Sequence, residues 1–466
     1  MTSAVGTRPV GGPGFRDVFG LAEFRALWLA QVLSVSGDQL ARVALTVLVY
    51  DRTRSALLAA VTFAASVVPT FVGGITLSGL ADRMPRRRVM IGADLASAGL
   101  VGVMVVPGVP LAVLVLLLVA VTMVGALFLA ARSATYPEIL DKDCYPLGAA
   151  VTMTTSLSAQ VAGFAVGGIA VAFLGVRVSL LADAATFGAS ALIVRAWVGS
   201  RPLPTPAPAA GRPAAARRRS RGRHAKPGPA AGVAGGLRLT FGSPAMRIPM
   251  LFGWLCAFYE LPEGVAAPLA RQVGGGTVTV GLILAAQALG SAAGVLGFSR
   301  MGSAAQRARW MGPLAIAASA SLIPFAVGPG LVAVLIILAV SGVFGCYQIA
   351  ANAAFVQATP AAQRSQAFGI AQGGISLMQG TAILIAGAAA ERAAPTSVIA
   401  VAGAAGALCA VALALSTPLR GERATVLSKG GRMPASRCCG QEVGRVLVQA
   451  AAHRGQRHRA GPQRIG

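Results

Sequence analysis

The chain has 466 residues, of which 55% are hydrophobic and only 12% are charged. Its mean hydropathy of +0.70 excludes an ordinary soluble globular protein, in which charged residues are about twice as frequent. The formal charge of +25 would indicate nucleic acid as the partner of a soluble protein. Aromatic residues do not interleave with the basic ones, however, so no nucleic-acid partner is expected.

Twelve apolar runs are long enough to cross the membrane as helices, six before residue 199 and six after residue 246. A span of about 20 apolar residues covers the roughly 30 Å of hydrocarbon. The sequence therefore predicts an all-α polytopic membrane protein with twelve transmembrane helices in two bundles of six. The predicted segments are a cytoplasmic N-terminal segment 1–25, an N-terminal bundle 26–198, a linker 199–246, a C-terminal bundle 247–416 and a tail 417–466.

The basic residues predict the orientation of these helices. Short loops rich in Lys and Arg stay in the cytoplasm, and here they alternate with loops that carry few, so both termini are expected inside a bacterial plasma membrane. The basic linker and tail contain few apolar residues that could pack, so we expect them to be disordered and to attract anionic lipid. A monomer in the lipid bilayer is expected.

The sequence contains no pattern typical of an enzyme or a metal site. All three histidines lie outside the predicted spans, the six cysteines lack metal-ligand spacing, and no phosphate-binding loop or nucleophile constellation occurs. We therefore expect neither catalysis nor a metal or other cofactor. The proton gradient is the expected energy source, with carboxyl groups as the proton carriers.

The first span carries Gln31, Asp38 and Arg42. An acid four residues before a base lies on the same face of a helix, so Asp38 and Arg42 can neutralise each other inside the membrane. Charged residues in spans usually face a cavity. The pair is therefore either a structural ion pair or part of a transport pathway.

A basic turn, Ser78–Met90, separates the second and third spans. It resembles the loop G-x-L-A-D-R-x-G-R-R of the major facilitator superfamily. The resemblance implies two pseudo-symmetric six-helix bundles and a cytoplasmic gate in which this loop makes charge contacts between them. A basic anchor that only fixes orientation is the alternative. The residues that match the family loop are Asp82, Arg83, Arg86 and Arg87. Arg88 and Asp94 complete the gating candidates by their position, and Asp94 is alternatively a partly solvated carboxylate near the interface.

Two further motifs resemble the macrolide-efflux and siderophore-export branch of this superfamily. The fourth span ends with Arg132 and is expected to close at Pro137, as in the segment A-R-x-A-x-x-P-E-L. Arg132 is alternatively an interfacial anchor. Gly163, Gly167 and Gly168 of the fifth span resemble the antiporter motif G-P-x-x-G-G, which marks exporters in the family. Such glycines let neighbouring helices approach closely.

The seventh span contains Glu260 and Glu263, which lie on one face of a helix near the middle of the membrane. Two close carboxylates in a medium of low dielectric are not both expected to be ionised, so the pair is expected to hold a proton. Pro262 and Gly264 are expected to interrupt the helix beside a cavity. Alternatively, Glu263 lies solvated in an outer vestibule.

Three more polar residues of the spans complete the candidates. Gln372 and Gln379 of the eleventh span suit either the wall of a substrate cavity or contacts between helices. Asp183 of the sixth span is expected near the outer end, in a structural role.

We therefore expect a secondary active transporter that exports amphipathic drugs or secondary metabolites in exchange for protons. A dedicated siderophore or metabolite exporter, or an uncoupled facilitator, is an alternative. An alternative of another class is a membrane receptor or scaffold that recruits a partner through the basic linker. The residues expected around the central cavity are Asp38, Arg42, Glu260, Glu263, Gln31, Gln372 and Gln379.

Overall fold

The structure, a computed structural model of the whole chain, describes residues 15–81, 84–141, 144–201, 237–238, 240–300, 303–360 and 364–416. These residues form helices and connecting turns, without a strand among them, and the helices belong to one compact unit that ends at Leu415. Most of the predicted linker, the predicted tail, and Asp82 and Arg83 of the basic turn lie outside the described residues.

The first half of the chain forms six spans, because α3 and α4 are two parts of one span and α7 contains two. Gly175 separates the two spans of α7 with φ 81° and ψ 166°, a left-handed conformation that glycine adopts without a Cβ clash. The helices are α1 (Phe15–Gly20), α2 (Ala22–Thr53), α3 (Ala56–Ala65), α4 (Val68–Ala81), α5 (Arg86–Met104), α6 (Leu111–Ile139) and α7 (Tyr145–Trp197).

The second half begins with the interrupted span that the sequence predicts around Pro262 and Gly264, and the break is confirmed. This span consists of α10 (Pro244–Trp254), α11 (Cys256–Tyr259), the 3-10 turn η1 (Leu261–Glu263) and α12 (Ala266–Gln272). The other elements are α13 (Thr277–Ser299), α14 (Ala304–Ala320), η2 (Ile323–Val327), α15 (Leu331–Phe344), α16 (Tyr347–Ala358), α17 (Arg364–Ala390) and α18 (Pro395–Leu415).

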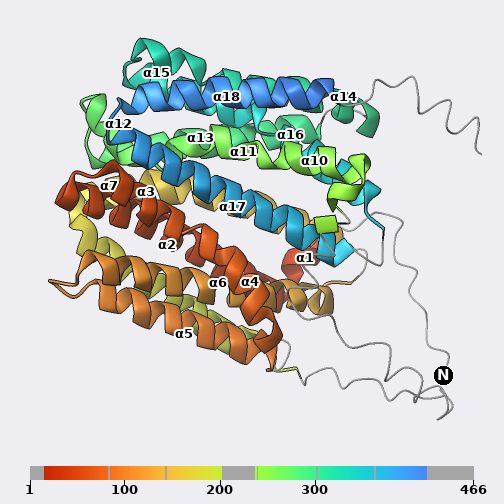
Figure 1. Cartoon of the computed structure of the whole chain (residues 1–466). Coiled ribbons are helices and arrows are strands. Elements are labelled where there is room, and N and C mark those ends of the chain that lie inside the picture. Colours follow the sequence, from red (N-terminus) through yellow and green to blue (C-terminus); the bar gives the residue numbers. More distant parts are fainter. Residues whose placement is uncertain are drawn as a thin grey trace, which may run out of the picture. The chain divides into compact units, whose positions relative to one another are not determined.

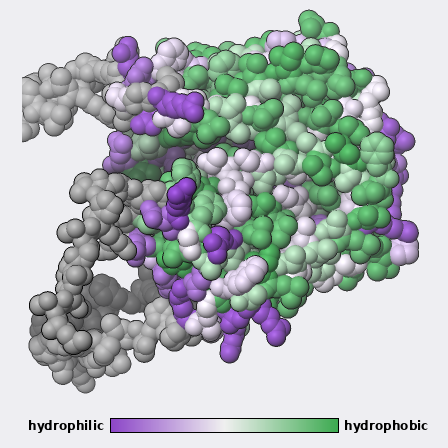
Figure 2. Space-filling model, turned by 180° about the vertical axis from the view of Figure 1, so that it is seen from behind, coloured by the Kyte–Doolittle hydropathy of each residue, from purple (hydrophilic) through white to green (hydrophobic). Residues whose placement is uncertain are grey.

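The predicted number of spans agrees with these elements. Nine described segments are long and apolar enough to cross a membrane by length and composition, and one of them, Leu147–Trp197, contains two spans. The charged helix α5 and the broken span α10–α12 bring the total to twelve. Figure 2 shows apolar side chains over the middle of the molecule and hydrophilic ones towards its two ends, as expected of a protein embedded in lipid.

One predicted helix end is wrong. The fourth span does not close at Pro137, since α6 continues to Ile139. A proline removes one backbone hydrogen bond and distorts the preceding turn, but it does so here in the last turn. There Arg86 Nη1 donates a hydrogen bond of 2.6 Å to the carbonyl oxygen of Ala134. A side chain from α5 thus contacts the last turn of α6.

The two halves meet mainly along two pairs of helices, α7 with α13 and α3 with α17. Figure 1 shows α17 running between the first-half helices and the rest of the second half. Small residues allow both contacts: a Cβ on Gly168 would lie 2.8 Å from Gly281 Cα, and a Cβ on Gly387 would lie 2.4 Å from Ala60 Cβ. Backbones therefore touch directly at this seam.

We call the end of the helices near Thr53, Gln272 and Ala390 the outer end, after the orientation predicted from the basic loops, and the opposite end the inner end. At the outer end Arg271 Nη2 lies 2.7 Å from Asp51 Oδ1, which joins the two halves. The ion pairs of the described residues at the inner end all lie within the first half.

Candidate functional site

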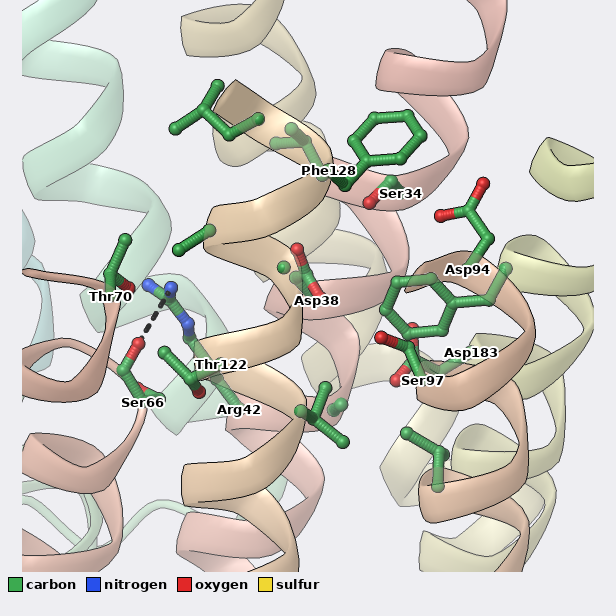
Figure 3. Close-up of a pocket in the computed structure, with 18 of the residues that line it drawn as sticks. Ser34, Asp38, Arg42, Ser66, Thr70, Asp94, Ser97, Thr122, Phe128 and Asp183 are labelled. Atoms are coloured by element: carbon green, nitrogen blue, oxygen red, sulfur yellow. Dashed lines mark hydrogen bonds between the residues drawn. The ribbon is translucent and has the colours of Figure 1, made fainter. Parts of the chain in front are cut away.

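A cavity of about 280 Å³ lies inside the first half, enclosed by α2, α5, α6, α7 and the break between α3 and α4. Its wall carries acidic, basic and hydroxyl groups among apolar side chains (Figure 3). The polar residues that line it are Gln31, Ser34, Asp38, Arg42, Ser66, Thr70, Asp94, Ser97, Thr122, Arg132, Ser156 and Asp183.

Asp38 is the centre of the charged groups in this cavity. It interacts electrostatically with Arg42, one turn further along α2. It also interacts with Asp94 of α5 and with Asp183 of α7. The predicted proximity of Asp38 and Arg42 on one helix face is therefore present, but two further acids share the same surroundings.

Arg42 reaches from the first half towards the second. Its Nη2 donates a hydrogen bond of 3.2 Å to the carbonyl oxygen of Ser66, where α3 ends. A cation at the carbonyl end of a helix is favoured by the helix dipole. Its guanidinium also interacts electrostatically with Glu263 of η1 in the second half. Arg42 makes no direct ion pair with a described residue, so its charge is shared between Asp38 and Glu263.

Asp94 and Asp183 are both buried, with 1% of their surface exposed. Asp94 Oδ2 accepts a hydrogen bond of 2.6 Å from Ser190 Oγ of α7, so it faces the helix bundle instead of the basic turn. Asp183 does not lie near the outer end as the sequence analysis expected. It follows Gly175 by eight residues, which corresponds to about 12 Å of helix. Its Oδ1 contacts the backbone of α2 at Gly37.

Gln31 and Arg132 line the inner part of the same cavity. Gln31 Nε2 donates to Ser156 Oγ of α7, and Gln31 Oε1 accepts from Tyr136 at 3.3 Å. Arg132 is buried, so it is not the interfacial anchor that one interpretation of the sequence gave. Its guanidinium lies 6.0 Å from the ring centre of Phe128 and 5.9 Å from that of Tyr136, positions suited to cation–π attraction.

The second half contains a separate cluster of polar side chains. Glu260 and Glu263 interact electrostatically with each other at the break of the seventh span. Neither lines the cavity of the first half; Glu263 is connected to it through Arg42. Beside them Gln348 Nε2 donates to Tyr259 Oη at 3.0 Å, and Tyr347 Oη donates to the carbonyl oxygen of Phe252 at 3.0 Å.

Gln372 and Gln379 do not line the cavity of the first half. Both belong to α17, where Gln372 is exposed and Gln379 is half-buried. Their neighbours Gly373 and Gly380 pack against Phe71 and Val68 of α4. The two glutamines therefore flank the seam between the halves.

The described part of the basic turn contacts only the first half. Arg86 Nη1 forms an ion pair of 2.5 Å with Glu138 of α6. Arg87 Nη2 donates a hydrogen bond of 2.5 Å to the carbonyl oxygen of Arg195 in α7, and Arg88 is exposed. A gate would require contacts between the two halves, and Arg86 and Arg87 make none of these with the described residues. Asp94 lines the cavity of the first half instead.

The glycine motif of the fifth span has two separate partners. Gly163 and Gly167 face α2, where a Cβ on them would lie 2.9 Å from Gln39 Cβ and 3.1 Å from Leu40 Cα. Gly168 faces Gly281 of α13 in the other half. The motif therefore joins the helix that carries Asp38 to the seam.

A comparison with known protein families identifies the family of this chain. The family described as Major Facilitator Superfamily matches residues 27–262 and 263–452. The chain belongs to the Major Facilitator Superfamily. It is a multi-pass membrane transporter of this type, and the family assignment expected from the basic turn and the glycines is confirmed.

Solved structures confirm the superfamily fold at low sequence identity. A POT family transporter in complex with 5-aminolevulinic acid has a TM-score of 0.65 and 12% identity, and the match covers 88% of this chain and 98% of that one. A mutant form of the nucleoside transporter NupG has a TM-score of 0.60 and 13% identity over 84% and 99% of the two chains.

A bacterial homologue of the human lysosomal transporter Spinster, in an inward-facing and unoccupied conformation, has a TM-score of 0.57 and 14% identity over 84% and 95%. Curated protein sequences give no match.

Proposed function

We propose that this member of the Major Facilitator Superfamily exports amphipathic compounds in exchange for protons. The observation that carries the proposal is the position of Arg42. A single guanidinium interacts with Asp38 of its own helix and with Glu263 of the opposite half. Protonation of either acid would change which half attracts Arg42, and this supports coupling between proton binding and the movement of the two halves.

The mixed polarity of the cavity in the first half supports an amphipathic substrate. The cavity of the first half combines carboxyl, guanidinium and hydroxyl groups with apolar side chains such as Val101, Met104 and Phe128. Binding sites of this composition hold the apolar body of a ligand and orient its polar groups. A small molecule that carries both would match it.

The glycine motif supports export. Gly163, Gly167 and Gly168 resemble the antiporter motif, and they pack α7 against α2 and α13. The macrolide-efflux and siderophore-export branch is accordingly the proposed relationship within the superfamily. A bacterial plasma membrane, cytoplasmic termini and a monomeric state belong to the same proposal, as does anionic lipid at the basic linker and tail.

Three alternative functions remain to be distinguished by experiment. A dedicated siderophore or metabolite exporter would couple to protons with a narrower substrate range, and an uncoupled facilitator would move substrate without protons. A receptor or scaffold would depend on the basic linker. Deletion of residues 201–230 would abolish the activity of a scaffold and leave that of a transporter largely intact.

The test is proton movement in energised inside-out vesicles on addition of macrolides, lipophilic cations or siderophores. The wild type is compared with Glu263→Gln and with Asp141→Asn, which changes an exposed acid beyond the end of α6. We expect compound-dependent proton efflux that is lost in Glu263→Gln and kept in Asp141→Asn. Transport of a compound without any proton movement would contradict proton coupling and favour the facilitator.

A further inference from the structure

The three aspartates of the first-half cavity follow one another through the bundle. Asp94 lies eight residues inside the inner end of α5 and accepts a hydrogen bond from Ser190. Asp183 precedes Ser190 by seven residues on α7, roughly 10 Å along the helix. Asp38 of α2 interacts electrostatically with both. The acids therefore form a series, Asp94, Asp38, Asp183, from the inner part of the bundle towards its outer part.

Figure 3 shows these three side chains around one cavity, with Arg42 and Asp183 on opposite sides of Asp38 in that view. Serine hydroxyls of the same wall, Ser34 and Ser97, add hydrogen-bonding groups. A cavity of about 280 Å³ with polar walls is large enough to hold several water molecules. Water can thus bridge carboxyl groups that do not touch.

The charges in this cavity do not balance. Three carboxyl groups face two guanidinium groups, Arg42 and Arg132, and Arg42 is shared with Glu263. An uncompensated carboxylate is strongly unfavourable in a buried site. At least one of the three acids is therefore expected to hold a proton.

Two atoms of the cavity residues are buried without a hydrogen-bond partner. They are Asp183 Oδ1 and Arg132 Nε, on side chains with 1% and 8% of their surface exposed. Buried polar atoms of this kind usually have a partner. An orphaned carboxyl oxygen at one end and an orphaned donor at the other are sites at which water or a proton would bind.

We propose that Asp94, Asp38 and Asp183 form a proton path inside the first half, separate from the Glu260 and Glu263 pair at the seam. In each step an O–H bond breaks at a protonated carboxyl or water and forms at the next carboxylate or water, so one proton and one charge move. The path rests on the proposed proton coupling and assigns the protons to three acids of the cavity wall that are not needed to hold the substrate.

The groups that face the path are few. The main helices packed against α7 are α2, α5 and α13, and α13 contacts the span of α7 that does not carry Asp183, at Gly168. Among their described residues, Asp38 interacts electrostatically with Asp183, Asp94 lines the same cavity, and α13 carries no ionisable side chain. Asp38 also meets Arg42, and the cavity adds Arg132 of α6.

A metal ion is a poorer occupant than a proton. Among the described residues, no three acidic, histidine or cysteine side chains lie close enough together to hold a metal ion.

The first experiment detects protons directly and needs no substrate. The full-length protein in lipid nanodiscs is taken through an acid-to-alkaline pH cycle, and the infrared absorption of protonated carboxyl groups, identified by its downshift in D₂O, is recorded. The wild type is compared with Asp94→Asn, Asp183→Asn and the exposed control Asp141→Asn. We expect part of the buried carboxyl absorption to be lost in the first two variants only. Identical spectra for all four proteins would overturn the proposal.

A more conservative substitution tests the proposal even if the Asn variants do not fold. Ser190→Ala removes the hydrogen bond to Asp94 but no charge, and it should shift the carboxyl absorption without abolishing it. An unshifted band would contradict the assignment to Asp94. Replacing choline chloride by NaCl distinguishes the occupants, because loss of the absorption in Na⁺ would show a sodium site and not a proton path.

The second experiment separates the path from the substrate route. In proteoliposomes, Asp183→Asn should lose proton movement but keep downhill transport of a compound that the wild type carries. Loss of compound binding as well would place Asp183 in the substrate site and overturn the separation. If the wild type moves no protons with any compound while the infrared absorption still depends on Asp183, the proposed function fails and the proton-binding site stands.

Discussion

Arg42 shows how one buried cation can serve several acids. It lies half-buried beside a cavity, caps the carbonyl end of α3 through Ser66 and interacts with Asp38 and Glu263. Removing one partner of a buried charge pair is much more destabilising than removing both. The surroundings of Arg42 therefore predict a non-additive response to substitution.

We expect Arg42→Gln to destabilise the protein, because it leaves Asp38 and Glu263 without their cation. Loss of a fully buried partner costs about 3 to 5 kcal/mol, and a smaller loss of about 1 to 3 kcal/mol is expected for a hydrogen-bonded cation that borders a cavity. The double variant Asp38→Asn/Arg42→Gln should recover part of this loss. Thermal unfolding in detergent measures both, and strictly additive effects would contradict the shared-cation interpretation.

The acid residues were only partly interpretable from sequence. The spacing of Asp38 and Arg42 predicts a shared helix face, and the interaction is present. A count along the chain gives depth but not the neighbouring helix, so the interaction of Asp183 with Asp38, on a helix more than a hundred residues earlier, was not predictable. A count of eight residues from the turn glycine Gly175 would already have placed Asp183 well inside the membrane.

Among the helices, the glycine pair Gly168 and Gly281 is the closest backbone contact of the seam. A Cβ on Gly168 would lie 2.8 Å from Gly281 Cα, and a Cβ on Gly281 would lie 2.7 Å from Gly168 Cα. Neither backbone can retreat as a flexible side chain could. The contact between α7 and α13 therefore requires glycine, whose side chain is a single hydrogen atom, at both positions.

We expect Gly168→Ala or Gly281→Ala to destabilise the closed seam, since overpacking of a tight contact costs about 1 to 3 kcal/mol. The matched controls are Gly188→Ala on α7 and Gly297→Ala on α13, where a Cβ would meet no atom within 4 Å. Thermal unfolding and vesicle transport should change in the first two variants and not in the controls. Equal stabilisation in all four would show that helix propensity, and not the contact, is responsible.

Periodicity and hydropathy predicted the elements better than their contacts. The twelve spans, the break at Pro262 and the packing glycines follow from local composition. The end of α6 lies two residues beyond Pro137, because a proline in the last turn removes a single backbone hydrogen bond and does not by itself end the helix. The cavity was not predictable either, since it forms where five helical segments that are distant in sequence converge.

At the scale of the whole molecule, the two halves are joined at the outer end by polar contacts from both sides. Arg271 pairs with Asp51, and Glu391, just after α17, accepts hydrogen bonds from Ser55 Oγ at 2.7 Å and from Leu57 N at 2.8 Å. Glu391 thus caps the beginning of α3 from the opposite half. A contact that exists only when the outer end is closed must favour that state.

The pKa of Glu391 predicts how this contact depends on pH. The hydrogen bonds from Leu57 N and then from Ser55 Oγ hold the pKa of Glu391 below its ordinary value of 4.5. Because the pKa of Glu391 is lower in the folded protein, the contact is at full strength above pH 4.5. It is lost as the pH falls through the lowered pKa of Glu391. The closed outer end should therefore be unaffected near neutral pH and should open only in strong acid.

We expect Glu391→Gln to open the outer end already at neutral pH and to remove the acid-dependent part of the opening. Spin labels at Arg52 and Val327, exposed residues of the two halves near the outer end, in a background without other cysteines, would report the distance between the halves by electron paramagnetic resonance. Arg177→Gln is the matched control, since it changes an exposed charge beside Gly175 at the same end. A distance distribution in Glu391→Gln that equals the wild type at every pH would show that the contact does not hold the halves together, and would leave the backbone contact of Gly168 with Gly281 as the main closure of the seam.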